Sequence, residues 1–300
     1  MIRRILLGRS GTELLAWVAM VILVFASFTG AFAEEPPSDT LKVVFIAYQN
    51  PGKVAEDLKP VVAYMEKTLG VKVKDYVATD YAGVVEALRN KSADMGFMGP
   101  LQYVMAHKYA GAYPILGEVY GKKASYVSRI FVRKDSGIKS LSDLRGKTIA
   151  FTDPLSSSGY LYPLDLFKDK GLVKAKPEDF FRRVYYAGGD EQAIRSVLNN
   201  FTDSAGIGQF AYSLLKPAER DALVYIGESK PLPSHCIVVR KDLNAGTVKA
   251  VQDALFALNE GPNTGLLKNL YGVDGYVKVT HKDFEEVEGV AREHGFIKGE

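Results

Sequence analysis

The chain contains a single cysteine, Cys236, among its 300 residues. One thiol excludes an intrachain disulfide and a zinc site built from several thiolates. The four histidines are scattered and form no pair at helical spacing, so the sequence predicts no metal site and no cofactor. In an exported protein a lone cysteine is typically buried and unreactive.

The first 33 residues have the pattern of a secretory signal peptide. Three arginines precede an apolar run at residues 14–25, and Ala31-Phe32-Ala33 places small residues where a signal peptidase reads them. We therefore expect cleavage after Ala33 and export to the periplasm. The alternative is an uncleaved membrane anchor, because the apolar run is nearly long enough to span a bilayer.

Neither sign of charge is in surplus once this segment is removed. Its three basic residues and one acidic residue leave 35 Lys and Arg against 34 Asp and Glu. A nucleic-acid-binding protein usually shows a basic surplus on one face, so we expect a small-molecule partner and no nucleic-acid partner. The remaining length, about 267 residues, suffices for one large domain or for two lobes.

Strand-like and helix-like segments alternate along the rest of the chain. Strand patterns at residues 41–47, 71–77 and 94–98 are each followed by a helical pattern. This alternation predicts an α/β fold whose mainly parallel sheets are flanked by helices. In such folds ligands bind at the carboxyl ends of the strands, beside helix starts.

Two strand patterns end in the same sequence, Val-Arg-Lys-Asp, at residues 132–135 and 239–242. We interpret both strands as crossings between two lobes. Residues 41–132 and 234–300 would then form lobe 1, and residues 133–233 would form lobe 2.

Three consecutive serines, Ser156, Ser157 and Ser158, separate a strand pattern from a helix pattern that begins at Gly159. Hydroxyls and free N–H groups at a helix start, with the partial positive charge of the helix dipole, are suited to binding an anion. The alternative is a polar loop in which one serine caps the helix.

Motifs on both sides of the serines carry a resemblance to a known family. They are Tyr81-Ala82-Gly83, residues 93–100, Tyr126 with residues 132–138, residues 143–147 and residues 156–160. On these motifs the chain resembles the periplasmic phosphonate- and phosphite-binding proteins of ABC importers, a branch of the two-lobed type II solute-binding fold. The resemblance implies a monomer that closes over one small oxyanion, docks on a permease of the inner membrane and catalyses no reaction.

The resemblance also implies roles for individual residues. Ser156, Ser157 and Ser158 would bind the oxyanion at the helix start, and Tyr126 would reach the same group. Tyr81 would line the side of the pocket that receives the ligand's substituent.

Two departures from the family pattern bear on the choice of ligand. Asp190 stands where the family usually has a histidine, and a carboxylate repels a dianion in a low-dielectric cleft. Asp190 would therefore stay protonated or accept an O–H of the ligand, unless the ligand is not a phosphorus oxyanion. Members that bind aminoalkyl phosphonates have carboxylates at the positions of Phe210 and His235, so we do not expect an aminoethyl ligand. His235 is included as a site residue by its position.

Two alternatives of other classes stay open. The same fold could serve a sensor that recognises a different small molecule and signals through a receptor or kinase. A cleft lined by tyrosine and aspartate could also belong to an enzyme.

Overall fold

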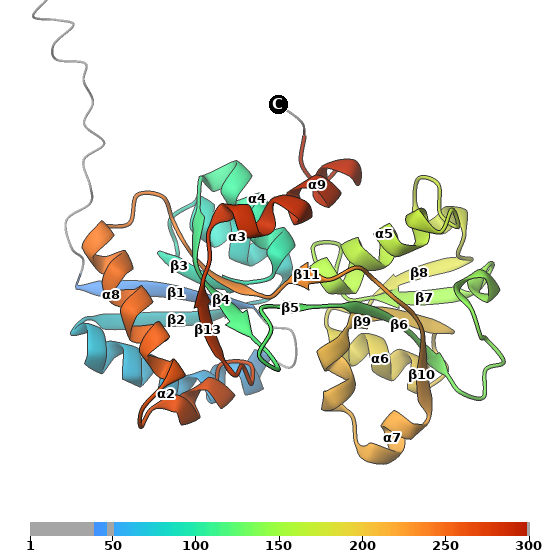
Figure 1. Cartoon of the computed structure of the whole chain (residues 1–300), viewed down its shortest axis with the longest axis horizontal. Helices are drawn as coiled ribbons and strands as arrows, with labels where there is room; N and C mark the ends of the chain where they lie inside the picture. The colour runs from blue at the N-terminus through green and yellow to red at the C-terminus, as the bar shows by residue number, and fades with distance from the viewer. Residues whose placement is uncertain (1–38, 47–50, 299–300) are drawn as a thin grey trace, which may run out of the picture. The chain divides into compact units, whose positions relative to one another are not determined.

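The computed structural model describes residues 39–46 and 51–298, and the chain from residue 37 onward forms one compact unit. The expected signal peptide and its cleavage site after Ala33 lie outside the described residues. Within the described residues no helix is both long and apolar enough to cross a membrane. Two sheets flanked by helices organise the compact unit (Figure 1).

The first sheet contains six strands in the order β13-β4-β12-β3-β1-β2. Their bounds are β1 Thr40–Ile46, β2 Lys72–Ala78, β3 Met95–Met98, β4 Tyr113–Val119, β12 Cys236–Val239 and β13 Gly275–Lys278. Its helices are α2 Pro51–Leu69, α3 Tyr81–Arg89, α4 Pro100–Ala110, α8 Ala245–Phe256 and α9 Glu285–Glu293.

Side chains of β1 alternate between two hydrophobic layers, as the period of a strand requires. Val43 and Phe45 pack with apolar residues of α2 and α8 on one face. Val44 and Ile46 pack with α3, α4 and α9 on the other face. The sheet is therefore buried on both sides, which explains the nearly continuous apolar run in its sequence.

The second sheet contains five strands in the order β10-β6-β9-β7-β8. Their bounds are β6 Ser128–Arg133, β7 Thr148–Phe151, β8 Arg183–Tyr186, β9 Ser204–Gly208 and β10 Leu223–Glu228. Its helices are α5 Tyr162–Asp169, α6 Asp190–Leu198 and α7 Pro217–Asp221. A third, two-stranded sheet pairs β5 Ser125–Tyr126 with β11 Leu232–Pro233.

Short helical turns connect these elements. They are η1 Leu141–Leu144, η2 Ser157–Leu161, η3 Pro177–Asp179, η4 Gln209–Leu214, η5 Ala257–Asn259, η6 Thr264–Lys268 and η7 His281–Phe284.

Most described strands of each sheet point the same way, as the sequence predicts. In the second sheet β7, β8 and β9 are parallel, and only β6 runs against its neighbours. In the first sheet β1, β2 and β3 are parallel, whereas β12 runs against both β3 and β4. β13 in turn runs against β4, so β12 and β13 share the opposite direction in the first sheet. β6 and β12 are the strands that enter each sheet after a connection from the other one.

The interpretation of the two Val-Arg-Lys-Asp strands as crossings is wrong. β6 lies wholly in the second sheet, including residues 128–132 that the sequence assigned to lobe 1, and β12 lies in the first sheet. The connections are instead the segments around β5 and β11. The repeated motif marks two strand ends: Arg133 Nε pairs with Asp135 at 2.8 Å, and Arg240 pairs with Asp242 at 2.6 Å.

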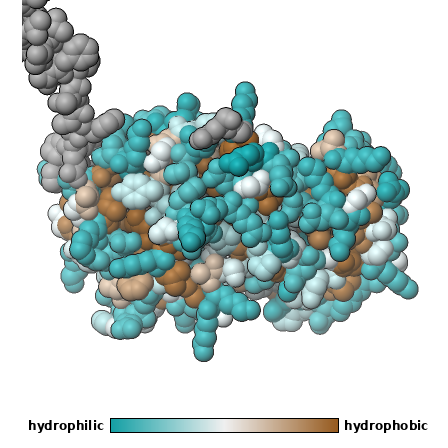
Figure 2. Space-filling model, turned by 45° about the horizontal axis from the view of Figure 1, so that its top comes forward, coloured by the Kyte–Doolittle hydropathy of each residue, from teal (hydrophilic) through white to brown (hydrophobic). Residues whose placement is uncertain are grey.

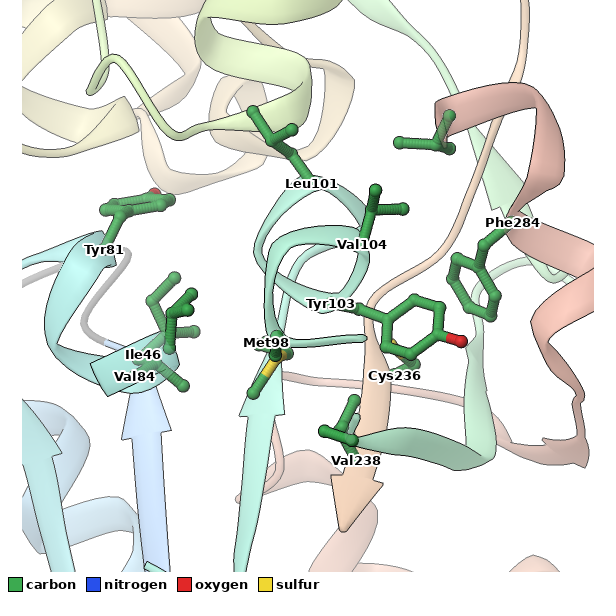
Figure 3. Packing of buried hydrophobic residues seen from close by; sticks show 14 of the residues in the cluster. Ile46, Tyr81, Val84, Met98, Leu101, Tyr103, Val104, Cys236, Val238 and Phe284 are labelled. Carbon is green, nitrogen blue, oxygen red and sulfur yellow. The ribbon is translucent and has the colours of Figure 1, made fainter. Parts of the chain in front are cut away.

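One hydrophobic cluster joins elements of both sheets. Around Met98, Tyr103 and Phe284, apolar side chains of β3, α4 and the C-terminal segment pack together (Figure 3). The same cluster includes Leu161 and Tyr162, at the junction of η2 and α5. Burial of each such side chain stabilises the fold by about 1.5–3 kcal/mol. Hydrophilic side chains cover much of the face seen in Figure 2.

Candidate ligand-binding site

A cavity of about 110 Å³ lies between residues of the two sheets. A single water needs about 10–15 Å³ of such volume, so the cavity has room for a small molecule. Six of the seven predicted site residues line it: Tyr81, Tyr126, Ser156, Ser158, Asp190 and His235.

These side chains meet because they follow the carboxyl ends of strands. Tyr81 comes three residues after β2, Ser156 follows β7, and Asp190 follows β8. The carboxyl ends of parallel strands lie at one edge of a sheet, so residues far apart in sequence are gathered there. The sequence-based placement of the site is consistent with this geometry.

Ser156 fulfils both interpretations of the serine run. It is the N-cap of η2, and its Oγ accepts the N–H of Gly159 at 3.0 Å. It also lines the cavity and is hydrogen-bonded to Tyr81. The backbone N–H groups of Ser157 and Ser158 lie in the first turn of η2. N–H groups in a first turn have no acceptor within the helix, so an external acceptor can bind them.

Ser158 is 5% exposed and is held from two sides. Its carbonyl accepts the hydroxyl of Ser128 on β6 at 2.6 Å. Its side chain is hydrogen-bonded to Tyr126, whose pKa is raised by burial while this hydrogen bond opposes the shift. Tyr126 is therefore a neutral hydroxyl that can donate to a ligand.

Ser157 does not line the cavity. Its Oγ accepts the N–H of Leu101 at 2.8 Å, in the first turn of α4. The hydroxyl thus joins the serine run to a helix of the first sheet. Ser157 therefore lacks the position beside the cavity that a direct ligand contact would need, although the resemblance implies such a contact.

Three site residues come together around Gly208, the last residue of β9. A Cβ at this position would lie 2.9 Å from Ser158 Oγ, 3.4 Å from Asp190 Oδ2 and 3.4 Å from Tyr126 Cε2. Any residue other than glycine at position 208 would force at least one of these three groups to move. We call Ser156, Ser158 and Asp190 the serine group; Tyr81, which is hydrogen-bonded to Ser156, borders it.

Asp190 is the first residue of α6 and receives two hydrogen bonds. The hydroxyl of Thr152 donates to Oδ1, and the N–H of Gly208 donates to the same carboxylate. Burial raises the pKa of Asp190 to about 6, and these two donors oppose the rise. At neutral pH the carboxylate is therefore mostly ionised.

A second carboxylate, Glu118, lines the same cavity, although no motif in the sequence points to it. It is 1% exposed on β4, and its Oε2 accepts the hydroxyl of Tyr120 at 2.8 Å. Burial raises the pKa of Glu118 to about 8, so the neutral acid predominates at pH 7. The pattern does not predict β4, because Pro114 and Gly117 interrupt it.

His235 lies beside this acid, with Nδ1 3.7 Å from Glu118 Oε2. Burial lowers the pKa of His235 to about 4, so at pH 7 a neutral imidazole stands next to a neutral carboxylic acid. We call Glu118, Tyr120, Phe210 and His235 the glutamate group.

Tyr126 lies between the two groups. Its hydroxyl meets Ser158, while its ring stacks on Phe210 at 5.6 Å and on His235 at 5.5 Å between centroids. The cavity therefore presents hydroxyls on one side of Tyr126 and a buried acid with aromatic rings on the other. No lysine or arginine is among the described residues that line it. Nor do three or more His, Cys, Asp or Glu side chains anywhere in the described part of the chain form a group that could hold a metal ion.

Comparison with known families and proteins gives concordant matches. The profile of a family described as "ABC transporter, phosphonate, periplasmic substrate-binding protein" matches residues 43–284. The phosphate-import protein PhnD of Mycolicibacterium smegmatis is 30% identical over 270 residues, which cover 87% of this chain and 77% of that protein. The phosphonates-binding periplasmic protein of Escherichia coli is 31% identical over 244 residues, covering 77% and 69%.

Solved structures share the fold at lower sequence identity. PhnD1 from Prochlorococcus marinus, in complex with methylphosphonate, superposes with a TM-score of 0.77 at 19% identity, covering 86% of this chain and 99% of that one. A binding protein of an ABC phosphonate transporter from Pseudomonas aeruginosa gives a TM-score of 0.77 at 22% identity, with coverages of 85% and 86%. Both confirm the α/β architecture with two flanked sheets.

Proposed function

Because the chain belongs to the family of periplasmic phosphonate-binding proteins of ABC transporters, we propose that it binds a small phosphorus oxyanion in the cavity between its sheets. The convergence of Ser158, Tyr126 and Asp190 around Gly208 carries this proposal. Members of this family are solute-binding components of importers, so the protein serves transport together with a membrane permease.

The serine group supplies donors for the oxyanion. Ser156 and Ser158 offer hydroxyls, the start of η2 offers backbone N–H groups, and Tyr126 offers a phenol that burial keeps protonated. Hydrogen bonds to an ionised group are worth about 1.5–3 kcal/mol each. Several such bonds in a closed cavity hold an anion without a lysine or arginine.

Asp190 would select the protonation state of the ligand. With Thr152 and Gly208 donating to it, the carboxylate keeps its acceptor character and meets a ligand oxygen best when that oxygen carries a proton. Phosphate, phosphite and phosphonates carry such a proton near neutral pH, whereas sulfate and sulfonates do not. Asp190 would therefore favour a protonated phosphorus oxyanion over a sulfur oxyanion.

Entry of the ligand requires the two sheets to separate. The connections at β5 and β11 are suited to be the hinge, because they pair with each other and belong to neither large sheet. In the present form Ser157 and Leu101 are bonded across the two halves. Hinge closure of this kind buries the ligand and creates the surface that a permease recognises. The monomeric state and export through cleavage after Ala33 are part of this proposal.

A ligand screen tests the proposed function. Thermal unfolding of the purified protein would be followed with phosphate, phosphite, methylphosphonate, sulfate and methanesulfonate. A ligand present at a hundred times its Kd stabilises the folded state by about 2.7 kcal/mol, which raises the melting temperature clearly. We expect a rise with at least one phosphorus oxyanion and none with the two sulfur oxyanions. A rise with the sulfur compounds alone, or with no oxyanion, would contradict the proposal.

A further inference from the structure

One buried oxygen in the cavity has no partner. Glu118 is 1% exposed, and its Oε1 is a buried atom without a hydrogen-bond partner among the described residues. Its other oxygen is occupied by the hydroxyl of Tyr120. A buried polar atom left unpaired costs about 1–3 kcal/mol, so such atoms in native proteins typically meet a ligand, an ion or a water.

No cationic side chain lies beside Glu118 among the described residues that line the cavity. The basic group that it approaches is the imidazole of His235, which is neutral at pH 7. The other titratable side chains that interact with Glu118 are Tyr120, Tyr126, Cys236 and Tyr276, and none of them is a cation. Glu118 therefore stays a neutral acid whose Oε1 lacks a partner: a ligand hydroxyl can pair with the acid, and a ligand ammonium group would stabilise its ionised form.

We propose that Glu118 binds a hydrogen-bond donor, a hydroxyl or an ammonium group, on the substituent of the ligand. The proposal rests on the proposed function, which assigns the oxyanion to the serine group. Tyr126 contacts Ser158 with its hydroxyl and His235 with its ring, so an anion at the serine group directs its substituent toward the glutamate group. The cavity of about 110 Å³ limits that substituent to a small one.

This assignment reverses an expectation from the sequence. An amine-bearing ligand is not expected from Phe210 and His235, because neither provides a carboxylate. The fold supplies one from another strand: Glu118 lies on β4, and its backbone N–H donates to the carbonyl of His235 at 2.9 Å. The carboxylate of Glu118 thus lies beside His235, one of the two positions where amine-binding members of the family have a carboxylate and this chain does not.

Three phosphonates that differ only at the carbon test the proposal by calorimetry: methylphosphonate, hydroxymethylphosphonate and aminomethylphosphonate. We expect at least one of the two polar ligands to bind the wild-type protein at least tenfold more tightly than methylphosphonate. Glu118→Gln keeps the size of the side chain but removes its ability to ionise. It should lower the affinity for aminomethylphosphonate at least tenfold and leave that for methylphosphonate within about twofold, where tenfold corresponds to about 1.4 kcal/mol.

Proton release gives a second measurement that a purely structural glutamate would not change. Binding of an ammonium group converts the neutral acid to a carboxylate, so aminomethylphosphonate should release a proton at pH 7. The heat of binding would then depend on the ionisation enthalpy of the buffer differently in the two proteins, and the wild-type protein should release about one proton more per bound ligand than Glu118→Gln.

The control is Tyr276→Phe, which removes a buried hydroxyl near Glu118 that also has no hydrogen-bond partner among the described residues. If Glu118 has only a structural role, both variants will change stability and neither will change the preference among the three ligands, which overturns the proposal. Equal wild-type affinities for all three phosphonates overturn it as well. Failure of the proposed function is a separate result, in which methylphosphonate and phosphate do not bind at all.

Discussion

Two carboxylates line one cavity, yet their surroundings give them different properties. Asp190 accepts hydrogen bonds from the hydroxyl of Thr152 and the backbone N–H of Gly208, and its pKa is raised only to about 6. Glu118 accepts one hydrogen bond, from the hydroxyl of Tyr120, and its other oxygen has no partner; burial raises its pKa to about 8. At pH 7 the first is mostly a charged acceptor and the second is mostly a neutral acid. Burial raises the pKa of both acids, and Asp190, which accepts more hydrogen bonds, keeps the lower value.

The difference suits the two acids to different parts of a ligand. Asp190 belongs to the serine group and meets the oxyanion, where a fixed acceptor selects a proton on the ligand. Glu118 belongs to the glutamate group and meets the substituent, where a group that can lose its proton adapts to a hydroxyl or to an ammonium ion.

The largest expected effect tests the serine group itself. Ser158→Ala removes a hydroxyl that lies beside Asp190 and Tyr126, and it should weaken binding of every phosphorus oxyanion about 10- to 100-fold, as expected for a hydrogen bond to an ion. Calorimetry measures the change. Ser142→Ala, at an exposed position of η1, is the matched control and should not alter the affinity. An unchanged affinity in Ser158→Ala would exclude this hydroxyl from ligand contact.

Replacing the charged acceptor sharpens the comparison of the two acids. Asp190→Asn removes the negative charge but keeps the shape, so the discrimination between phosphorus and sulfur oxyanions should fall about tenfold, or about 1.4 kcal/mol. Competition between methylphosphonate and methanesulfonate measures the ratio. Glu118→Gln should leave this ratio unchanged, and a loss of discrimination in that variant instead would reverse the roles assigned to the two acids.

A smaller effect is expected at Ser157, which contacts α4 rather than the cavity. Ser157→Ala leaves the N–H of Leu101 without its partner and should destabilise the closed form by about 1 kcal/mol, as for a neutral hydrogen bond. Ligand binding, which depends on the closed form, should weaken about fivefold. The loss should be the same for all ligands. A loss as large as that of Ser158→Ala would restore Ser157 as a direct contact.

The smallest expected effect is on stability without ligand. The folded protein holds a proton on Glu118 up to pH 8, whereas the unfolded chain loses it near pH 4.5. Stability from this group is thus present at low pH and lost as pH rises through 8. Asp190 completes most of its titration below pH 6.5, and the unfolded-state imidazole of His235, which loses its proton near pH 6.5, opposes the fall only slightly, so Glu118 dominates between pH 6.5 and 8.

Over that interval the free energy of unfolding should fall by about 1.5 kcal/mol, which lowers the melting temperature by about 3–6 °C. Thermal unfolding in phosphate-free buffers measures it. Glu118→Gln should flatten the profile between pH 6.5 and 8, whereas Asp190→Asn should leave that interval unchanged. A wild-type stability that rises over the interval would contradict the assignment of a raised pKa to Glu118.

Much of the fold could be predicted from local sequence alone. The apolar run of β1, the helical spacing in α2 and the serines before η2 each have a period or a cap that depends on neighbours in sequence. Strands β4 and β13 could not, because their stability comes from pairing with distant strands rather than from their own pattern.

The alternation of strands with helices and the hydroxyls at a helix start can be read from local sequence, since both depend on residues a few positions apart. Which of these hydroxyls face the cavity depends on contacts between distant parts of the fold. Adjacent Ser157 and Ser158 point to different partners, because α4 packs against one and β9 against the other. The tertiary structure also brought Glu118 beside His235, residues that are more than a hundred positions apart. Strand pairing produces that proximity, and no local pattern encodes it.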